Sequence, residues 1–131
     1  NEVMQALWKR LLLLYAVSGL TLYSLAGSAM AAGNIEAGGK LYQMRCSPCH
    51  GTDGKANTPT AQALNPKPRD HSDGAYMNKL THDHLAKVIK NGGVAVGKSQ
   101  IMPAHVDLSD QQIDDVVAFV RTLAIPPYSQ K

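Results

Sequence analysis

Cys46-Ser47-Pro48-Cys49-His50 reads C-x-x-C-H and contains the only two cysteines of the 131-residue chain. Two thiols three residues apart fall on one face of a helical turn, so both can add to the vinyl groups on one side of a single haem. His50 follows under the ring, where its imidazole can bind the iron. The motif therefore predicts one covalently attached haem c, held through Cys46 and Cys49, with His50 as a ligand of its iron.

Three other chemistries use paired cysteines, and the rest of the sequence argues against each of them. A zinc site takes C-x-x-C as half of its ligand set and needs a second pair; the chain has no second cysteine pair, and His82 with His84 could only complete an unusual Cys₂His₂ set. A thioredoxin-like redox motif needs a βαβ setting, and no strand pattern flanks the motif. A disulfide across C-x-x-C would close a very short loop and stabilise little. Haem attachment is the preferred interpretation.

The N-terminal residues have the layout of an export signal. Lys9 and Arg10 precede an uncharged run over residues 11–32, which closes with Ala29-Met30-Ala31. A basic region, an apolar region and an A-x-A exit predict a cleaved signal peptide at residues 1–31. The run is also long enough to span a bilayer, so an uncleaved membrane anchor is the alternative. Either interpretation predicts export, to the periplasm or to the outer face of the cytoplasmic membrane.

Residues 32–131 are expected to form one domain with a cofactor in its core. This part of the chain has few aromatic residues: Tyr42, Tyr76, Phe119 and Tyr128. A domain of about 100 residues needs a large apolar core to offset its conformational entropy. A buried haem would supply much of the missing apolar volume.

Charge is unevenly distributed along this domain. Nine basic and four acidic residues lie between Lys40 and Lys98, whereas the stretch from Asp107 to Asp115 has four aspartates and no basic residue. Such polarity can orient a molecule in the field of a partner, and it is equally compatible with an ordinary solvated surface. A nucleic acid is not an expected partner, because the sequence has no dense basic run with interleaved aromatics.

The first of three predicted helices runs from about Ile35 into the C-x-x-C-H motif. It carries Gly38 and Gly39, which are unfavourable in a helix and suggest that another backbone passes close by. A long polar loop over residues 51–78 follows the motif. A loop of that length is unusual in a compact domain, unless it wraps around a cofactor.

The other two predicted helices have clear boundary signals. The second begins after Thr81, a good N-cap, and ends at Asn91-Gly92-Gly93. The third begins with the capping box Ser109-x-x-Gln112, and Pro126 prevents it from continuing.

These features together resemble class I cytochrome c, over about Ile35 to Ala124. The resemblance rests on C-x-x-C-H, on the three helices, and on Ser99-Gln100-Ile101-Met102-Pro103-Ala104-His105 ahead of the last helix. It is similar to the small bacterial monohaem domains of that family. It implies an all-α cytochrome c fold, with three main helices and long loops around one haem. It also implies that Met102, a methionine followed by proline, is the second axial ligand of the iron.

Other residues compete for that second ligand position. Met77 is a weaker candidate, and His105 would give a bis-histidine haem. Met102 could instead fill a gap in the core. The remaining histidines are expected to have surface or capping roles: His71, His82 and His84.

Two further positions are candidates for contact with the haem. Arg69 could pair with a haem propionate, because arginine suits bidentate recognition of carboxylates. In the family a proline carbonyl often accepts the other N–H of the proximal histidine, and Pro59 and Pro66 both qualify. Tyr42 is expected in the interface between the first and last helices, or simply in the core.

The resemblance implies an electron carrier rather than an enzyme, with iron cycling between Fe(II) and Fe(III). Redox partner proteins would dock weakly and be steered by charge, with Lys55, Lys67 and Lys98 guiding an acidic partner. One alternative is a membrane-tethered subunit of a larger oxidoreductase complex, anchored by residues 11–32. Another is a haem enzyme with an open iron site.

Overall fold

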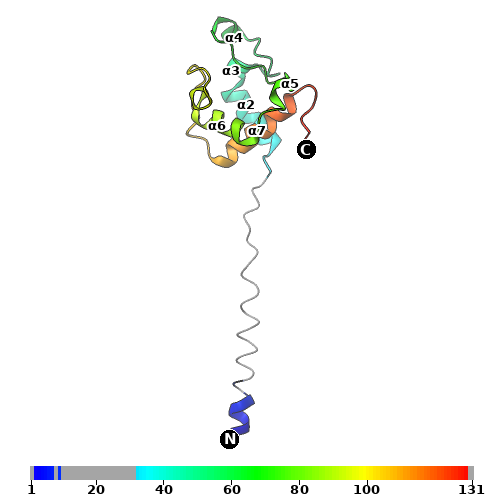
Figure 1. Ribbon diagram of the computed structural model, residues 1–131, viewed down its shortest axis with the longest axis vertical. Helices are drawn as coiled ribbons and strands as arrows, with labels where there is room; N and C mark the ends of the chain where they lie inside the picture. Colours follow the sequence, from blue (N-terminus) through cyan, green and yellow to red (C-terminus); the bar gives the residue numbers. More distant parts are fainter. Residues whose placement is uncertain (1, 8, 10–31, 130–131) are drawn as a thin grey trace. The chain divides into compact units, whose positions relative to one another are not determined.

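The computed structural model describes residues 2–7, 9 and 32–129 (Figure 1). The chain divides into two compact units, residues 1–30 and 31–131. Residues 2–7 and 9 are helical, and most of the predicted export segment lies outside the described residues. None of the helices that the structure describes is long and apolar enough to cross a membrane.

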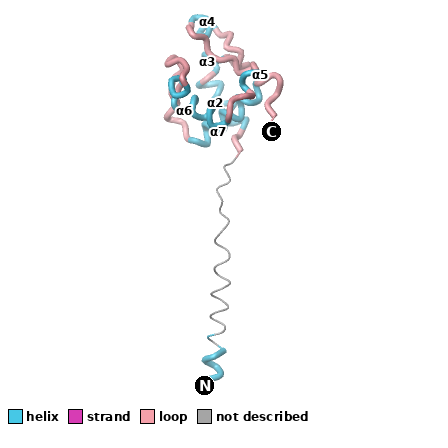
Figure 2. Tube along the Cα trace, in the orientation of Figure 1, coloured by secondary structure: helices cyan, strands magenta, loops and turns pink. Residues whose placement is uncertain are grey.

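The second unit is built from helices and loops, with no β-strand among its described residues (Figure 2). A single isolated bridge pairs Asp73 with Ile125. The helices, in chain order, are α2 (Ile35–Arg45), α3 (Ser47–His50), α4 (Pro59–Ala63), α5 (Gly74–Met77), α6 (His82–Asn91), the 3₁₀ helix η1 (Gly93–Val96) and α7 (Asp110–Leu123). The all-α prediction is confirmed, with α2, α6 and α7 as the three longest helices of this unit.

The predicted boundaries of the second and third helices are confirmed by their caps. The Thr81 side chain accepts a hydrogen bond from the backbone N–H of His84 at the start of α6. Ser109 and Gln112 form the predicted capping box at the start of α7. At the end of α6, Gly92 adopts a φ of +80°, a conformation that favours glycine.

The segment 51–78 contains more helix than its sequence suggested. The short helices α4 and α5 interrupt it, and each begins with a side-chain cap, Thr58 for α4 and Asp73 for α5. Helices of four or five residues are too short to display a helical repeat of apolar residues, so pattern analysis missed them.

Helices α2 and α7 cross at very close range. A Cβ atom placed on Gly38 would lie 1.8 Å from the backbone carbonyl oxygen of Asp115. Only a residue without a side chain permits such an approach. The prediction of a close backbone is confirmed at Gly38. Gly39 faces a side chain instead, because its Cβ would lie 3.1 Å from the ring of Phe119.

Polar and aromatic contacts hold the same crossing together. The buried carboxylate of Asp115 accepts hydrogen bonds from the backbone N–H of Asn34 at 2.7 Å and from the Gln111 side chain at 2.9 Å. The side chain of Asn34 in turn caps α2. Tyr42 is fully buried and packs against Phe119, with ring centroids 5.0 Å apart. Tyr42 therefore lies in the helix interface, as predicted.

The apolar core lies between these two helices and α6. Its buried members are Tyr42, Met77, Leu85, Ile89, Leu108, Ile113, Val116, Val117 and Val120. Several of them, including Ile89 and Val116, also line a cavity. The core and the cavity therefore share a wall.

Gly38→Ala is expected to destabilise the protein by more than about 3 kcal/mol. The new methyl group would collide with a backbone carbonyl that can move only if α2 and α7 separate. The urea midpoint of the haem-loaded protein measures the loss. Gly97→Ala is the matched control, because nothing lies within 4 Å of its Cβ although its φ is +69°, and it should cost about 1–2 kcal/mol. Equal losses of unfolding free energy in the two variants would contradict the close contact between α2 and α7.

Candidate haem site

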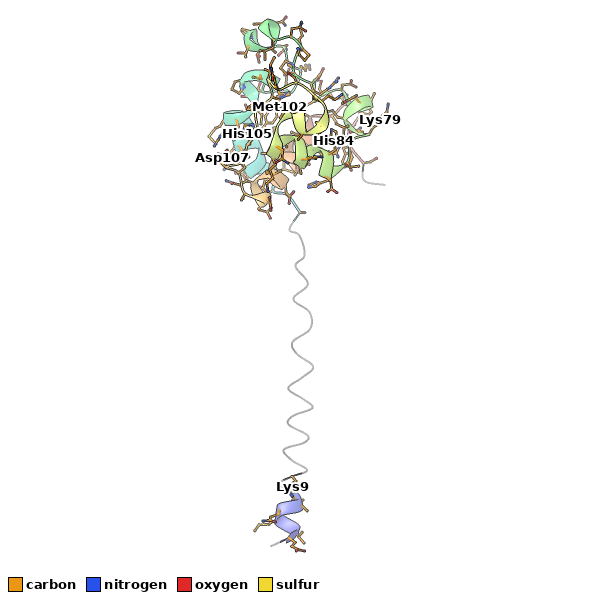
Figure 3. The ribbon with its side chains drawn as sticks, turned by 60° about the vertical axis from the view of Figure 1, so that its left-hand side comes forward. Lys9, Lys79, His84, Met102, His105 and Asp107 are labelled. Carbon is orange, nitrogen blue, oxygen red and sulfur yellow. The ribbon has the colours of Figure 1, made fainter. Side chains whose placement is uncertain are left out.

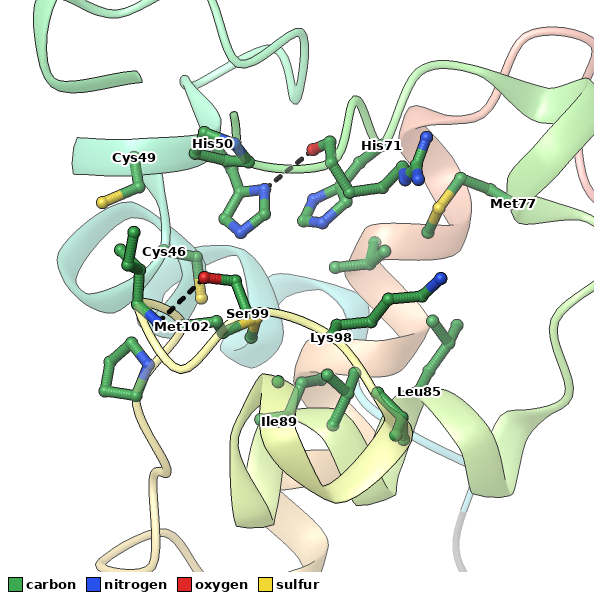
Figure 4. Close-up of a pocket in the computed structure, with 18 of the residues that line it drawn as sticks. Cys46, Cys49, His50, His71, Met77, Leu85, Ile89, Lys98, Ser99 and Met102 are labelled. Carbon is green, nitrogen blue, oxygen red and sulfur yellow. Dashed lines mark hydrogen bonds between the residues drawn. The ribbon is translucent and has the colours of Figure 1, made fainter. Parts of the chain in front are cut away.

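A cavity with mostly apolar walls lies beside the motif and is bounded by α3, α6, α7 and the loops around them (Figure 4). All the residues predicted to hold the haem line it: Cys46, Cys49, His50, Pro66, Arg69 and Met102. They come from the motif, from the loop before α5 and from the loop before α7. The fold therefore brings three separate segments together at one site.

The motif lies at the junction of two helices, α2 and α3. Helix α2 ends at Arg45, and the Cys46 carbonyl accepts hydrogen bonds from the N–H groups of Cys49 at 3.1 Å and His50 at 2.9 Å. The predicted first helix is thus two helices, α2 and α3, with Cys46 between them. Both cysteines are free thiols. Burial raises the pKa of the Cys46 thiol to about 11, so this thiol is protonated at neutral pH.

His50 is held with one ring nitrogen available. Its Nδ1 lies 2.9 Å from the backbone carbonyl oxygen of Arg69 (Figure 4). A carbonyl oxygen can only accept, so Nδ1 carries the proton and donates it. Burial lowers the pKa of His50, although the hydrogen bond to Arg69 opposes that shift, and the imidazole is neutral. Its Nε2 then keeps the lone pair that an iron ligand requires.

The Arg69 carbonyl takes the place of the proline carbonyl that the sequence analysis expected, for which Pro59 and Pro66 both qualified. Pro59 is the first residue of α4 and does not line the cavity. Pro66 lines the cavity, but its carbonyl is not the partner of His50. The path of the loop decides which carbonyl meets the ring, and local sequence does not encode that path.

The side chain of Arg69 also lies at the cavity. Its guanidinium stacks over the ring of Tyr76, 4.0 Å from the centroid, while the residue remains exposed. A guanidinium at the edge of the site, braced by an aromatic ring, can pair with a carboxylate. The proposed contact with a haem propionate stays a prediction.

Met102 lies on the loop between η1 and α7 (Figure 3). The backbone N–H of Gly93 donates to the Met102 carbonyl at 3.1 Å. A Cβ on Gly93 would lie 2.2 Å from the carbonyl oxygen of Ser99, so the loop packs directly on the turn after α6. These backbone contacts hold the half-buried Met102 at the cavity.

The rivals of Met102 divide into two groups. Met77, on α5, also lines the cavity and is 3% exposed. His105 does not line it, and its backbone N–H bonds to the Ile89 carbonyl at 3.1 Å. The geometry therefore leaves two methionines as candidate sulfur ligands and places His105 outside the site.

His71 is a site residue that the sequence analysis missed. Its ring is stacked on that of His50, with centroids 4.1 Å apart and planes 15° from parallel. Its Nδ1 lies 3.1 Å from the Tyr42 hydroxyl. Burial, together with the neighbouring His50 and Arg69, lowers the pKa of His71 to about 3. Its polar surroundings in the sequence predicted a surface role, and no local signal indicated this contact.

The acidic stretch forms contacts within the domain. Arg45 binds Asp107 at 2.6 Å and His82 binds Asp114 at 2.8 Å. Asp110 is paired as well, with Lys90. The remaining aspartate of the stretch, Asp115, is buried and accepts a hydrogen bond from the backbone N–H of Asn34. These contacts weaken the interpretation that the uneven charge of the chain orients the protein in the field of a partner.

The residues at the cavity fit a covalently attached haem. Two thiols are available for attachment, and a neutral imidazole with a free Nε2 is available for iron. Two thioethers can supply the soft second ligand, and apolar walls suit the faces of the ring.

Acidification is expected to destabilise the protein through His71. Its pKa is about 3 when folded, against an ordinary value of 6.5, so protonation favours the unfolded chain. The stabilisation is complete above pH 6.5 and is lost progressively as the pH falls towards 3. Between pH 7.5 and 5 the loss from this group should be about 2 kcal/mol, measured by urea unfolding. The variant His71→Phe should lack this component, and an identical pH dependence in both proteins would contradict it.

Comparisons with known proteins identify the family of the chain. No curated protein sequence matches the chain. Among solved structures, the fold is similar to a chain of the reducing HAO-like protein complex of Kuenenia stuttgartiensis, with a TM-score of 0.61 and 22% identity. The match covers 76% of this chain and 49% of that one, so this chain spans about half the length of its structural relative. The family model for cytochrome c matches residues 35–124. The chain therefore belongs to the cytochrome c family.

Proposed function

We propose that this haem electron-transfer protein carries single electrons at one haem c, bound covalently through Cys46 and Cys49 and ligated by His50 and Met102. The observation that carries the proposal is the state of His50, whose Nδ1 is tied to a backbone carbonyl while its Nε2 is left free. Met102 lines the same cavity. With both axial positions filled, the iron would exchange electrons without binding a substrate.

When bound, a c-type haem supplies reversible Fe(III)/Fe(II) chemistry, and a thioether ligand raises its potential. The chain supplies a fixed frame for that chemistry. The Arg69 carbonyl orients His50, and the Gly93 N–H holds the Met102 backbone. Ile89 and Val116 belong to the apolar wall of the cavity. Such a frame limits rearrangement when the charge of the site changes.

Met102→Leu and Met77→Leu test which sulfur binds the iron, since leucine keeps the apolar volume and removes the thioether. In the cytochrome c family, methionine ligation of the ferric iron gives a weak far-red absorption band, and we expect Met102→Leu to abolish it. Its potential should fall by on the order of 100 mV, because axial ligands tune haem potentials over about 0.8 V. Met77→Leu should keep the band and a nearly unchanged potential. Loss of the band in Met77→Leu and its retention in Met102→Leu would assign the ligand to Met77. A ferric wild-type protein that is already high-spin would favour a haem enzyme with an open iron site.

We propose export, to the periplasm or to the outer face of the cytoplasmic membrane. Support comes from Lys9 and Arg10 ahead of the uncharged run over residues 11–32. The alternative to a free carrier is a tethered subunit of a larger oxidoreductase, anchored by that run. The structural relative is part of a protein complex, by its own description. The mass of the native chain separates the two roles, because cleavage after Ala31 would leave a free carrier.

Redox partner proteins are proposed to dock at the mouth of the cavity. Lys67 and Lys98 are exposed and line the cavity, on loops that lie on different sides of α5 and α6 in the sequence. Lys55 is exposed on the turn after the motif, 3.9 Å from Asp53. Lys67 and Lys98 form the basic rim of the cavity, with Lys55 as a further exposed positive charge. These charges would attract an acidic partner and raise the rate of association.

Replacing Lys67 and Lys98 together by glutamine is expected to slow electron exchange with an acidic partner at least about three-fold at low ionic strength. The difference should vanish in about 1 M salt, where the screening length is about 3 Å. Stopped-flow kinetics measures both rates. Lys40 and Lys87 replaced by glutamine give the same change in net charge away from the cavity. If the variant lacking Lys67 and Lys98 exchanges electrons as fast as this control variant, electrostatic steering by the rim is refuted.

A further inference from the structure

The proposed function leaves the role of His71 unexplained, although its ring covers one face of the His50 ring (Figure 4). The two rings are close to parallel, at van der Waals separation. Turning the His50 ring about its Cβ–Cγ bond would drive its atoms into His71. A stacked neighbour of this kind therefore restricts rotation, provided that the neighbour is itself fixed.

His71 is fixed through both its side chain and its backbone. Tyr42, fully buried on α2, places its hydroxyl 3.1 Å from His71 Nδ1. Burial raises the pKa of the phenol, so the hydroxyl keeps its proton and forms a neutral hydrogen bond with Nδ1. The backbone N–H of His71 donates to the Gly54 carbonyl at 2.7 Å. One anchor is the helix before the motif, and the other is the turn directly after it.

The His50 ring is consequently constrained along an edge and over a face. The hydrogen bond from Nδ1 to the Arg69 carbonyl holds the edge at 2.9 Å. A hydrogen bond tolerates a considerable tilt of its donor, so this contact alone leaves the ring some rotation. The stacked ring of His71 removes that freedom. The two contacts together select one plane for the imidazole.

We infer that His71, held in place by Tyr42, is a positioning residue that sets the plane of the His50 imidazole and so the orientation in which it meets the haem iron. The inference rests on the proposed ligation of that iron by His50. Contacts to the groups around a ligand commonly fix its orientation and tune the metal. In this protein the neutral side chain of His71 would fix the His50 ring by packing and hydrogen bonding, without any transfer of a proton.

The test uses the haem-loaded ferric protein in a Met102→Ala background with cyanide added. Cyanide bound at the opened position is axially symmetric, so the paramagnetically shifted haem methyl resonances report the plane of His50 alone. We expect His71→Ala to alter the spread and order of these resonances, because the ring gains freedom to rotate. His71→Phe keeps a flat face and should preserve the pattern. Tyr42→Phe, which loses only the hydroxyl, should shift it less than His71→Ala.

Two further variants separate positioning from general loss of stability. Val117→Ala removes buried volume away from the cavity, since Val117 is 1% exposed and does not line it. This control should lower the urea midpoint and leave the methyl pattern unchanged. His71→Leu retains volume without a flat face, and it replaces His71→Ala if that variant does not fold.

Unchanged resonances in His71→Ala, or in His71→Leu where it replaces that variant, would overturn the inference, as would an equal change in Val117→Ala. A Met102→Ala protein that remains low-spin without cyanide would contradict the proposed ligation by Met102 instead. In that case the same His71 variants are compared in the otherwise unmodified ferric protein, where a changed pattern still supports the positioning role and an unchanged one overturns it.

Discussion

The crossing of α2 and α7 at Gly38 is the contact on which the rest of the structure depends. The backbone of α7 comes so near that a Cβ would lie 1.8 Å from a carbonyl oxygen. Close approach alone would leave polar groups buried without partners, which is costly. Asp115 avoids this cost, because its carboxylate accepts the N–H of Asn34 at the start of α2. Sterics and hydrogen bonding therefore select the same arrangement of the two helices.

That arrangement also positions the haem site, because the motif begins where α2 ends. Tyr42 lies one turn before Cys46, and its hydroxyl is hydrogen-bonded to His71. The position of α2 therefore fixes the position of the His71 ring. On the other side, Val116 belongs to α7 and to the cavity wall. A change in the helix crossing would therefore displace the attachment turn, the ring beside His50 and the wall together. Stability and the geometry of the site have the same structural origin.

Features governed by neighbouring residues were predicted well. The caps at Thr81 and Ser109 are confirmed, since a side-chain oxygen meets an N–H only a few residues away. Charge was a poorer guide. Asp107 and Asp114 belong to a stretch without basic residues, but in the fold they bind Arg45 and His82, which are distant in sequence. Reading charges along the chain could not reveal which of them already have partners.

The sequence by itself determined the cofactor and its covalent attachment, because two thiols and an imidazole within one turn have the required spacing whatever the rest of the chain does. The tertiary structure alone decided how His50 is held. Its hydrogen bond reaches a carbonyl 19 residues away, and its stacking partner His71 lies two residues further on. It also decided that both Met77 and Met102 reach the cavity. These contacts depend on the paths of long loops, and local conformational preferences do not specify such paths.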